Sequence, residues 1–195
     1  MTTRPKPPVD FQASVTIDGS SLTVEYTLRN KGPERLYVFD QPTRFDNGKA
    51  VVNRDYMSVL LENERRTVRL LHVFTPAPLL FNIARRPPNY ASVLEPGTKL
   101  ARTVRIMLPL KEDELFYPAL AVTTATPLQA SAVNVVVGFL EPRGGLIVEN
   151  SEYDGVVSLR GGWGEPRQWL VNQLVKLTVP VIEHDPPFER FPKLD

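Results

Sequence analysis

The chain has 195 residues, of which 23 are Lys or Arg and 22 are Asp or Glu, so its formal net charge is +1. It contains no cysteine, which excludes disulfide frameworks, cysteine zinc sites and thiol catalysis. The balanced charge provides no overall field that would attract nucleic acid or an anionic membrane. A chain of this length forms one large domain or two small ones. Its 19 prolines and 23 valines are typical of a β protein rich in loops.

Two alternating runs near the N-terminus predict the first strands. Apolar and polar residues alternate over 11–18 and again over 22–29, which is the period of a half-buried strand. Asp18-Gly19-Ser20 between them forms a short turn, so we expect an antiparallel hairpin. A third strand begins at 35–39, and Asp46-Asn47-Gly48-Lys49 predicts a second hairpin turn.

Further strands follow along the chain. The segments 57–61 and 68–74 flank a polar turn, and 133–140 is apolar on nearly both faces, as in a central strand. In 100–108 the inward positions are apolar except for Arg102, which we place near the start of the strand. Residues 146–148 and 156–159 flank a turn at Asp154-Gly155. We favour a strand for 174–181, and 168–174 fits either a strand or a short helix.

These elements predict one all-β domain over residues 10–182. The segments 1–9 and 183–195 are rich in proline and poor in apolar residues, so we expect them to be arms outside the core. Many short strands with turn signals every 8–12 residues indicate an antiparallel β-sandwich.

Two short motifs resemble immunoglobulin-like domains. The segment Val24-Glu25-Tyr26-Thr27-Leu28-Arg29-Asn30-Lys31-Gly32 resembles a strand of bacterial immunoglobulin-like domains that ends in Asn-x-Gly. Leu94-Glu95-Pro96-Gly97 is similar to the Pro-Gly turn before a later strand of the same domains. Fibronectin-III-like modules and BsuPI-type intracellular proteinase inhibitors share both features. The resemblance implies an immunoglobulin-like sandwich with insertions, because an ordinary domain of this kind has about 100 residues. A jelly roll is the alternative.

No pattern of residues predicts catalysis or metal binding. His72 lies within a strand without a nucleophile motif, and His184 lies in the C-terminal arm, so neither suits a triad or a zinc site. The acidic run Glu112-Asp113-Glu114 lacks the spacing of a calcium loop and is interpreted as a solvated turn. The paired glycines lack a phosphate-loop sequence. We therefore expect no enzyme activity, no cofactor and no metal.

Apolar and aromatic residues outside the strands are the candidates for an interface. The proline-flanked loop 74–90 either caps the core or forms a recognition loop. Trp163 lies in a glycine-rich loop with Trp169 nearby, and two phenylalanines interrupt the C-terminal arm. The interface candidates are Phe74, Leu79, Leu80, Phe81, Ile83, Trp163, Phe188 and Phe191.

The leading functional hypothesis is a non-enzymatic protein-interaction or structural subunit of a larger assembly. Its partner would be another protein or further copies of the chain, not nucleic acid. The first alternative is an intracellular protease inhibitor that presents loop 74–90, and the second is a carbohydrate-binding module that uses Trp163 and Trp169. No export signal or membrane span is evident, which predicts a cytoplasmic protein. Deletion of both arms is expected to leave the fold intact and to weaken assembly.

Overall fold

The computed structural model describes residues 6–46, 49–62, 66–74, 89–112, 125–142, 145–161 and 168–184. These residues form strands, turns and extended connections, and none of them lies in a helix, so the predicted all-β class is confirmed. The part of the chain that the structure describes therefore offers no helix with the length and apolarity needed to cross a membrane.

Three strands form a small antiparallel sheet in which the predicted N-terminal hairpin is confirmed. The strands are β1 (Val9–Asp18), β2 (Ser21–Asn30) and β9 (Lys99–Met107), in the order β1-β2-β9. Alternation puts every second side chain of β2 into the core, where Leu22, Val24 and Leu28 are fully buried. The opposite face of β2 carries polar and charged residues, of which Glu25 and Arg29 are exposed to solvent.

The other described strands form a nine-stranded sheet and a separate two-stranded ribbon. The main path of the larger sheet is β10-β14-β11-β3-β8-β13-β12, and β7 joins it through β11 and pairs with β6. Its strands are β3 (Leu36–Gln41), β6 (Ser58–Glu62), β7 (Thr67–His72), β8 (Asn89–Leu94), β10 (Leu110–Lys111), β11 (Ala125–Leu140), β12 (Leu146–Asn150), β13 (Val156–Gly161) and β14 (Trp169–His184). The ribbon is β4 (Thr43–Asp46) with β5 (Lys49–Val52).

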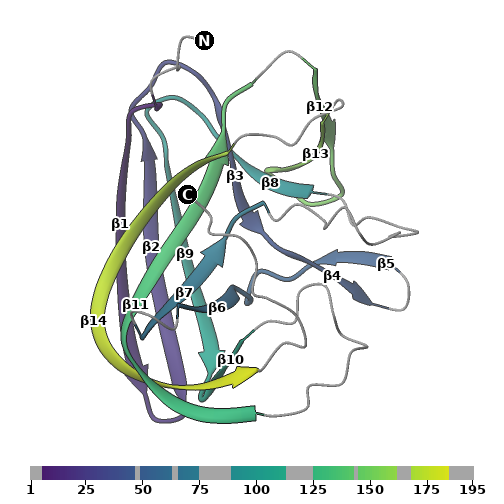
Figure 1. Cartoon of the computed structure of the whole chain (residues 1–195). Coiled ribbons are helices and arrows are strands. Elements are labelled where there is room, and N and C mark those ends of the chain that lie inside the picture. Colours follow the sequence, from purple (N-terminus) through teal and green to yellow (C-terminus); the bar gives the residue numbers. More distant parts are fainter. Residues whose placement is uncertain are drawn as a thin grey trace.

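The two sheets pack face to face as a sandwich (Figure 1). The long strands β11 and β14 are paired along most of their length and lie opposite the three-stranded sheet. In contrast to the predicted antiparallel arrangement, two pairings are parallel: β7 with β11 and β10 with β14. The hairpin β12–β13 lies on the far side of the larger sheet, away from β1.

Two apolar clusters lie on the two faces of the larger sheet. The main core between the sheets includes Leu36 and Val38 of β3. Their neighbours Tyr37 and Phe39 belong to the second cluster, because consecutive residues of a strand point to opposite faces. The second cluster also contains Ala91, Leu140, Val157 and Leu159, which come from β8, β11 and β13.

The two motifs that carry the resemblance meet at one end of the sandwich. The buried Asn30 side-chain amide donates to the carbonyls of Glu34 (2.7 Å) and Leu94 (3.2 Å), and its Oδ1 accepts from the Gly32 N–H (2.9 Å). The Gly97 N–H donates to the Asn30 carbonyl at 2.9 Å. Gly97 has φ of +76°, a conformation that favours glycine. Asn30 therefore fixes the end of β2 to the turn between β8 and β9.

The structure corrects several boundaries. Residues 169–174 belong to β14, so the open choice between strand and helix is resolved in favour of a strand. Val9 and residues 183–184, which we assigned to the arms, lie in β1 and β14. The strands predicted over 57–61 and 68–74 are found as β6 and β7, but β7 ends at His72, so residues 73–74 lie outside it.

Candidate functional site

A buried ion pair links the two sheets. Arg102 lies within the body of β9, opposite Tyr26 of β2, and not at the start of the strand. Its Nη2 lies 2.5 Å from Oδ2 of Asp40 on β3, whose side chain is 0% exposed, whereas that of Arg102 is 24% exposed. The guanidinium thus compensates a carboxylate that would be costly to bury alone. The misfit of Arg102 in an apolar pattern is explained by this partner.

Polar neighbours complete the network around Asp40. The Ser92 N–H donates to Oδ1 of Asp40 at 3.2 Å, and Arg102 Nη2 donates to Ser92 Oγ at 2.9 Å. The Gln41 amide nitrogen donates to Ser92 Oγ (2.8 Å) and to Oδ2 of Asp40 (3.2 Å), and Gln41 Oε1 accepts from Arg54 Nε (3.1 Å). Both carboxylate oxygens are therefore occupied by donors from the protein itself.

A second polar link joins the sheets through His72. Its Nδ1 lies 2.6 Å from the hydroxyl of Tyr26, and its Nε2 lies 2.7 Å from the carbonyl oxygen of Tyr56. A carbonyl can only accept, so Nε2 carries the proton and Nδ1 accepts from the tyrosine. Burial lowers the pKa of His72, and burial together with the Asp40 charge raises the pKa of Tyr26. Both groups are therefore neutral near pH 7.

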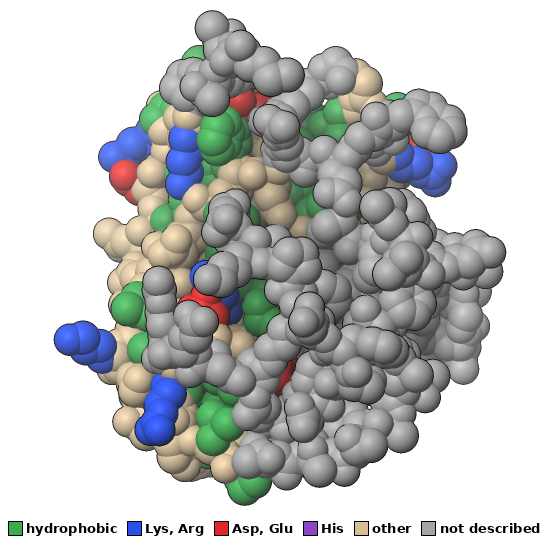
Figure 2. All heavy atoms as spheres, in the orientation of Figure 1, with side chains coloured by type: hydrophobic (Ala, Val, Ile, Leu, Met, Phe, Trp, Pro, Cys, Tyr) green, Lys and Arg blue, Asp and Glu red, His purple; other side chains and the backbone are tan. Residues whose placement is uncertain are grey.

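This polar cluster is suited to hold the sheets together and not to perform chemistry. Its donors and acceptors are directed at one another, and His72 faces a tyrosine and a carbonyl instead of a nucleophile. Within the described ranges, no group of three His, Asp or Glu side chains is arranged to hold a metal ion. On the face that Figure 2 draws, the Lys and Arg side chains of the described residues are separated from one another and do not gather into one patch.

The other sheet contacts the β1 edge of the three-stranded sheet at two points. The Lys31 N–H donates to the Pro8 carbonyl, so the even-numbered residues of β1 make the backbone hydrogen bonds to β2. The N–H of Ala13, an odd-numbered residue, therefore points away from β2. That N–H donates to Oε1 of Gln173 on β14 at 2.7 Å. The Lys6 ammonium donates to the Leu170 carbonyl of the same strand. These contacts fasten β1 to β14.

Side chains close two further edges. The Leu61 N–H on the outer side of β6 donates to Oε1 of Glu112 at 2.9 Å. Glu112 is only 7% exposed, so the prediction of a solvated turn is wrong at this residue. Beyond β7, Gln168 accepts from the Phe74 N–H (2.9 Å) and donates to the Phe74 carbonyl (2.8 Å), like a neighbouring strand. Gly138 leaves room for it, since a Cβ there would collide with Gln168.

No strand among the described residues pairs with the outer side of β9, and we call this side the open edge of the small sheet. The Asn30 N–H donates to the Thr98 carbonyl, and the Leu108 N–H donates to the Ser20 carbonyl. The backbone hydrogen bonds between β2 and β9 are therefore made by their even-numbered residues. The odd-numbered residues of β9 therefore turn their backbone groups outward. Among the described residues, the Ala101 carbonyl accepts from its neighbour Arg102 (3.0 Å), whereas the outward backbone groups have no partner at Thr103, Arg105 and Met107.

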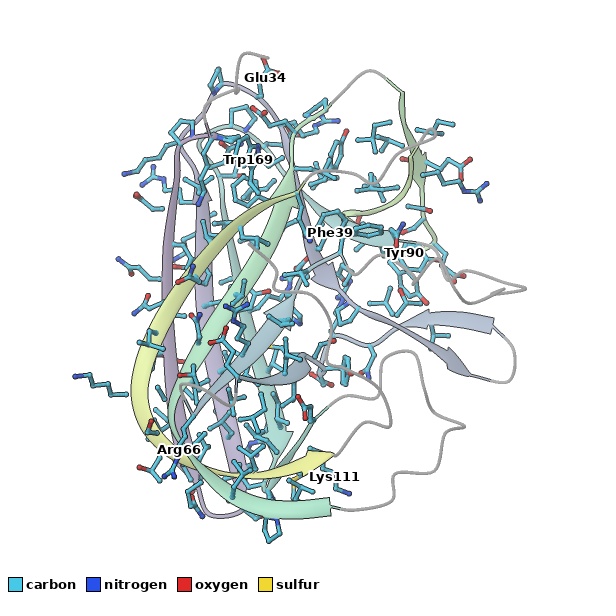
Figure 3. All side chains as sticks on the ribbon, viewed as in Figure 1. Glu34, Phe39, Arg66, Tyr90, Lys111 and Trp169 are labelled. Atoms are coloured by element: carbon cyan, nitrogen blue, oxygen red, sulfur yellow. The ribbon has the colours of Figure 1, made fainter. Side chains whose placement is uncertain are left out.

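A hollow of about 550 Å³ lies at the lower end of this open edge, between β9 and the segment that leads into β6. Its apolar lining includes Met57, Val59, Ile106 and Leu108, and we call it the β6–β9 hollow. Two exposed charged residues, Asp55 and Lys111, also line it. Figure 3 places Lys111 at this end of the sandwich and Trp169 at the opposite end. Met107 borders the hollow with 65% of its surface exposed.

Most of the interface candidates named from sequence lie outside the described residues. These are Leu79, Leu80, Phe81, Ile83, Trp163, Phe188 and Phe191. Phe74 is half-buried and packs against the second cluster, with its ring centroid 5.7 Å from that of Phe39. Trp169 is also half-buried and packs against the main core. The structure thus brings neither residue into the β6–β9 hollow.

Sequence reasoning missed the residues that close or open the edges. Gln173 and Gln168 lie in a segment without a clear period, and nothing in their spacing indicates which backbone group they meet. Arg102 gave a usable signal, because a cation at an inward position demands a buried acid, and Asp40 follows an apolar run.

Searches against protein-family models, curated proteins and solved structures give no match. The functional argument therefore depends on the geometry of this chain.

Proposed function

We propose that the chain is a non-enzymatic protein-interaction module that works in a larger assembly and docks an extended polypeptide segment on the open edge of β9. The observation that carries this proposal is the contrast between that edge and the others. Edge strands with unpaired backbone groups are templates for strand addition, and proteins usually blunt those they do not use. On β1 the outward N–H of Ala13 is bonded to Gln173, and on β6 that of Leu61 is bonded to Glu112, whereas no outward N–H of β9 has an acceptor among the described residues.

The immunoglobulin-like assignment belongs to the same proposal. In an immunoglobulin-like sandwich the first, second and fifth strands share one sheet, and the third, sixth and seventh share the other. The order β1-β2-β9 and the neighbouring β14, β11 and β3 fit that scheme when the additional strands are taken as insertions. The contact of Asn30 with the turn at Gly97 supports it as well. In this scheme β9 is the fifth strand, and the fourth strand, which lies beside the fifth in an ordinary immunoglobulin domain, has no counterpart in the described part of the small sheet.

The polar cluster supports a binding role over a catalytic one. It fixes Arg102 from the inside, so β9 keeps its position although none of the described strands pairs with its outer side. A prepositioned edge lowers the entropy cost of docking, because the acceptor strand is already ordered before the partner arrives.

Proline substitution tests strand addition. The Thr103 N–H points to the open edge, so Thr103→Pro removes a docking donor without removing a ladder hydrogen bond. The full chain would carry a photocrosslinking phenylalanine at the exposed Ala101 on β9, or at Gln12 on β1 as the matched position, and would be irradiated in its source cells.

We expect adducts to another polypeptide from position 101, at much higher yield than from position 12, and their loss when Thr103→Pro is added. Equal yields from both positions, or adducts that persist with Thr103→Pro, would overturn the proposal. A thermal melt of the proline variant close to that of the parent chain shows that the loss is not caused by unfolding.

A further inference from the structure

The charge along β9 indicates the chemistry of the segment that would dock there. The outward side chains of β9 include two cations, Lys99 and Arg105, and no acid. No ion pair involves Lys99 among the described residues, and the nearest carboxylate to Arg105 is that of Asp18 at 3.7 Å, where both side chains are mostly exposed. A strand added to this edge would therefore place its outward side chains beside two cations that are little neutralised.

The inward side of the added strand would meet a different surface. Side chains alternate across a strand, so the neighbours of the outward residues point toward the space between the sheets. At the lower end of β9 that space is the β6–β9 hollow, whose floor includes the buried Met57 and Val59. Asp55 and Lys111 contribute opposite charges at its border, so the apolar floor, and not a net charge, favours an apolar occupant.

We infer that the docked segment is an extended peptide that alternates acidic and apolar side chains. This inference depends on the proposed function and names the partner for the same edge. The acidic side chains lie outward beside Lys99 and Arg105, and one apolar side chain enters the β6–β9 hollow. A volume of about 550 Å³ exceeds that of a single large side chain and lies in the usual range for ligand sites. Met107 can adapt its flexible side chain to the occupant.

The experiment uses the full chain and a fluorescent, end-capped heptapeptide with the sequence Glu-Val-Glu-Leu-Glu-Val-Glu. Fluorescence anisotropy measures its binding, with the lysine analogue Lys-Val-Lys-Leu-Lys-Val-Lys as the comparison. We expect the acidic peptide to bind at least about tenfold more tightly than the basic one, with an affinity that falls as salt rises. Replacing the central leucine by asparagine should weaken binding several-fold, because the hollow then loses its apolar occupant.

Two arginines provide a matched pair of variants. Arg105 on β9 is 66% exposed, and Arg160 on β13 is 65% exposed. Arg105→Glu should weaken the binding of the acidic peptide about tenfold and strengthen that of the basic peptide, whereas Arg160→Glu should change the affinity for neither peptide. Equal losses from the two variants would show a general effect of net charge and would overturn the inference.

The outcomes separate the inference from the proposed function. One outcome is that both peptides bind equally, that Arg105→Glu leaves their affinities unchanged, and that Thr103→Pro abolishes binding. In that case the β9 edge docks polypeptides, but the inferred preference for acidic side chains is wrong. If light scattering shows a dimer that Thr103→Pro dissolves and the acidic peptide does not, a second copy is the occupant and the inference fails. If neither peptide binds and no crosslink from position 101 depends on Thr103, both the inference and the proposed function fail.

Discussion

The two edges of the three-stranded sheet differ in how their backbone groups are satisfied. At β1, the outward N–H of Ala13 is bonded to Gln173, and the strand is fastened to β14. At β9, the outward groups of Thr103 and Arg105 have no partner among the described residues. Both strands pair with the same central strand β2 and have similar lengths. The difference therefore comes from the neighbouring sheet and not from the strands themselves.

This comparison shows two ways to hold an edge strand in place. β1 is held from its side by a side-chain amide that substitutes for a missing strand. β9 is held from its inner face by Arg102, which reaches Asp40 across the sandwich. A charged residue that points inward is also a known means of discouraging indiscriminate pairing of edges. The second arrangement leaves the edge itself available while keeping the strand ordered.

The largest expected effect comes from proline at the paired side of β9. Val104 faces β2, so Val104→Pro removes a ladder donor and should cost about 3 kcal/mol or more of the free energy of unfolding. Thr103→Pro, one residue away, should cost about 1 kcal/mol or less, because its N–H has no partner among the residues that the structure describes. Urea denaturation compares the two variants. Similar losses would show that the outward side of β9 is bonded after all.

Removal of the inner attachment is expected to have a slightly smaller effect. Asp40→Ala leaves Arg102 and the Ser92 N–H without their buried acceptor, which should cost about 3 kcal/mol, the lower end for breaking a buried pair, because Arg102 is partly exposed. Asp40→Asn keeps an acceptor for Ser92 and should cost less. Denaturation of both variants provides the measurement. A loss below about 1 kcal/mol for Asp40→Ala would show that the ion pair does not hold β9.

Opening the closed edge is the third test. Gln173→Ala leaves the Ala13 N–H without an acceptor and should cost about 1–2 kcal/mol. The matched control is Asn172→Ala, whose side chain is exposed on the same strand. Amide exchange of Ala13 should accelerate in the first variant only. Unchanged exchange at Ala13 would mean that Gln173 does not close this edge.

The smallest effect is a pH dependence that concerns the link between β2 and β7. Burial lowers the pKa of His72 in the folded state, so the unfolded chain binds the proton first as the pH falls below about 6.5. Stability from the neutral histidine is therefore present above that pH and is lost below it, by at most about 1.4 kcal/mol per pH unit. Urea midpoints of the parent chain and of His72→Gln between pH 7.5 and 5.5 isolate this contribution. Identical pH profiles would contradict the assignment.

The sequence predicted the elements better than their connections. Alternation over 11–18 and 22–29 is strong because one face of each strand is buried, and both strands are found where the pattern places them. The parallel pairing of β7 with β11 was missed, because periodicity reports which face is buried and not which strand lies alongside. The segment 168–174 stayed open because apolar residues occupy both faces of β14 there.

The candidate site was less predictable for a similar reason. An open edge is defined by the absence of a neighbouring strand, and no residue of β9 encodes that absence. Arg102 signalled a buried partner, but whether it meets Asp40 depends on the packing of β3 against β9. Glu112 looked solvated within an acidic run, although it accepts from the Leu61 N–H of an edge strand far away in sequence.

Amide hydrogen exchange along the two edge strands tests the central claim most directly. In the isolated chain, the account predicts slow exchange at Arg102 and Val104 and fast exchange at Thr103 and Arg105, with protection of Ala13 on β1. Addition of the acidic heptapeptide should then slow exchange at Thr103 and Arg105 without changing Ala13. Slow exchange at Thr103 and Arg105 in the isolated chain would show that the β9 edge is already closed, and would contradict the account.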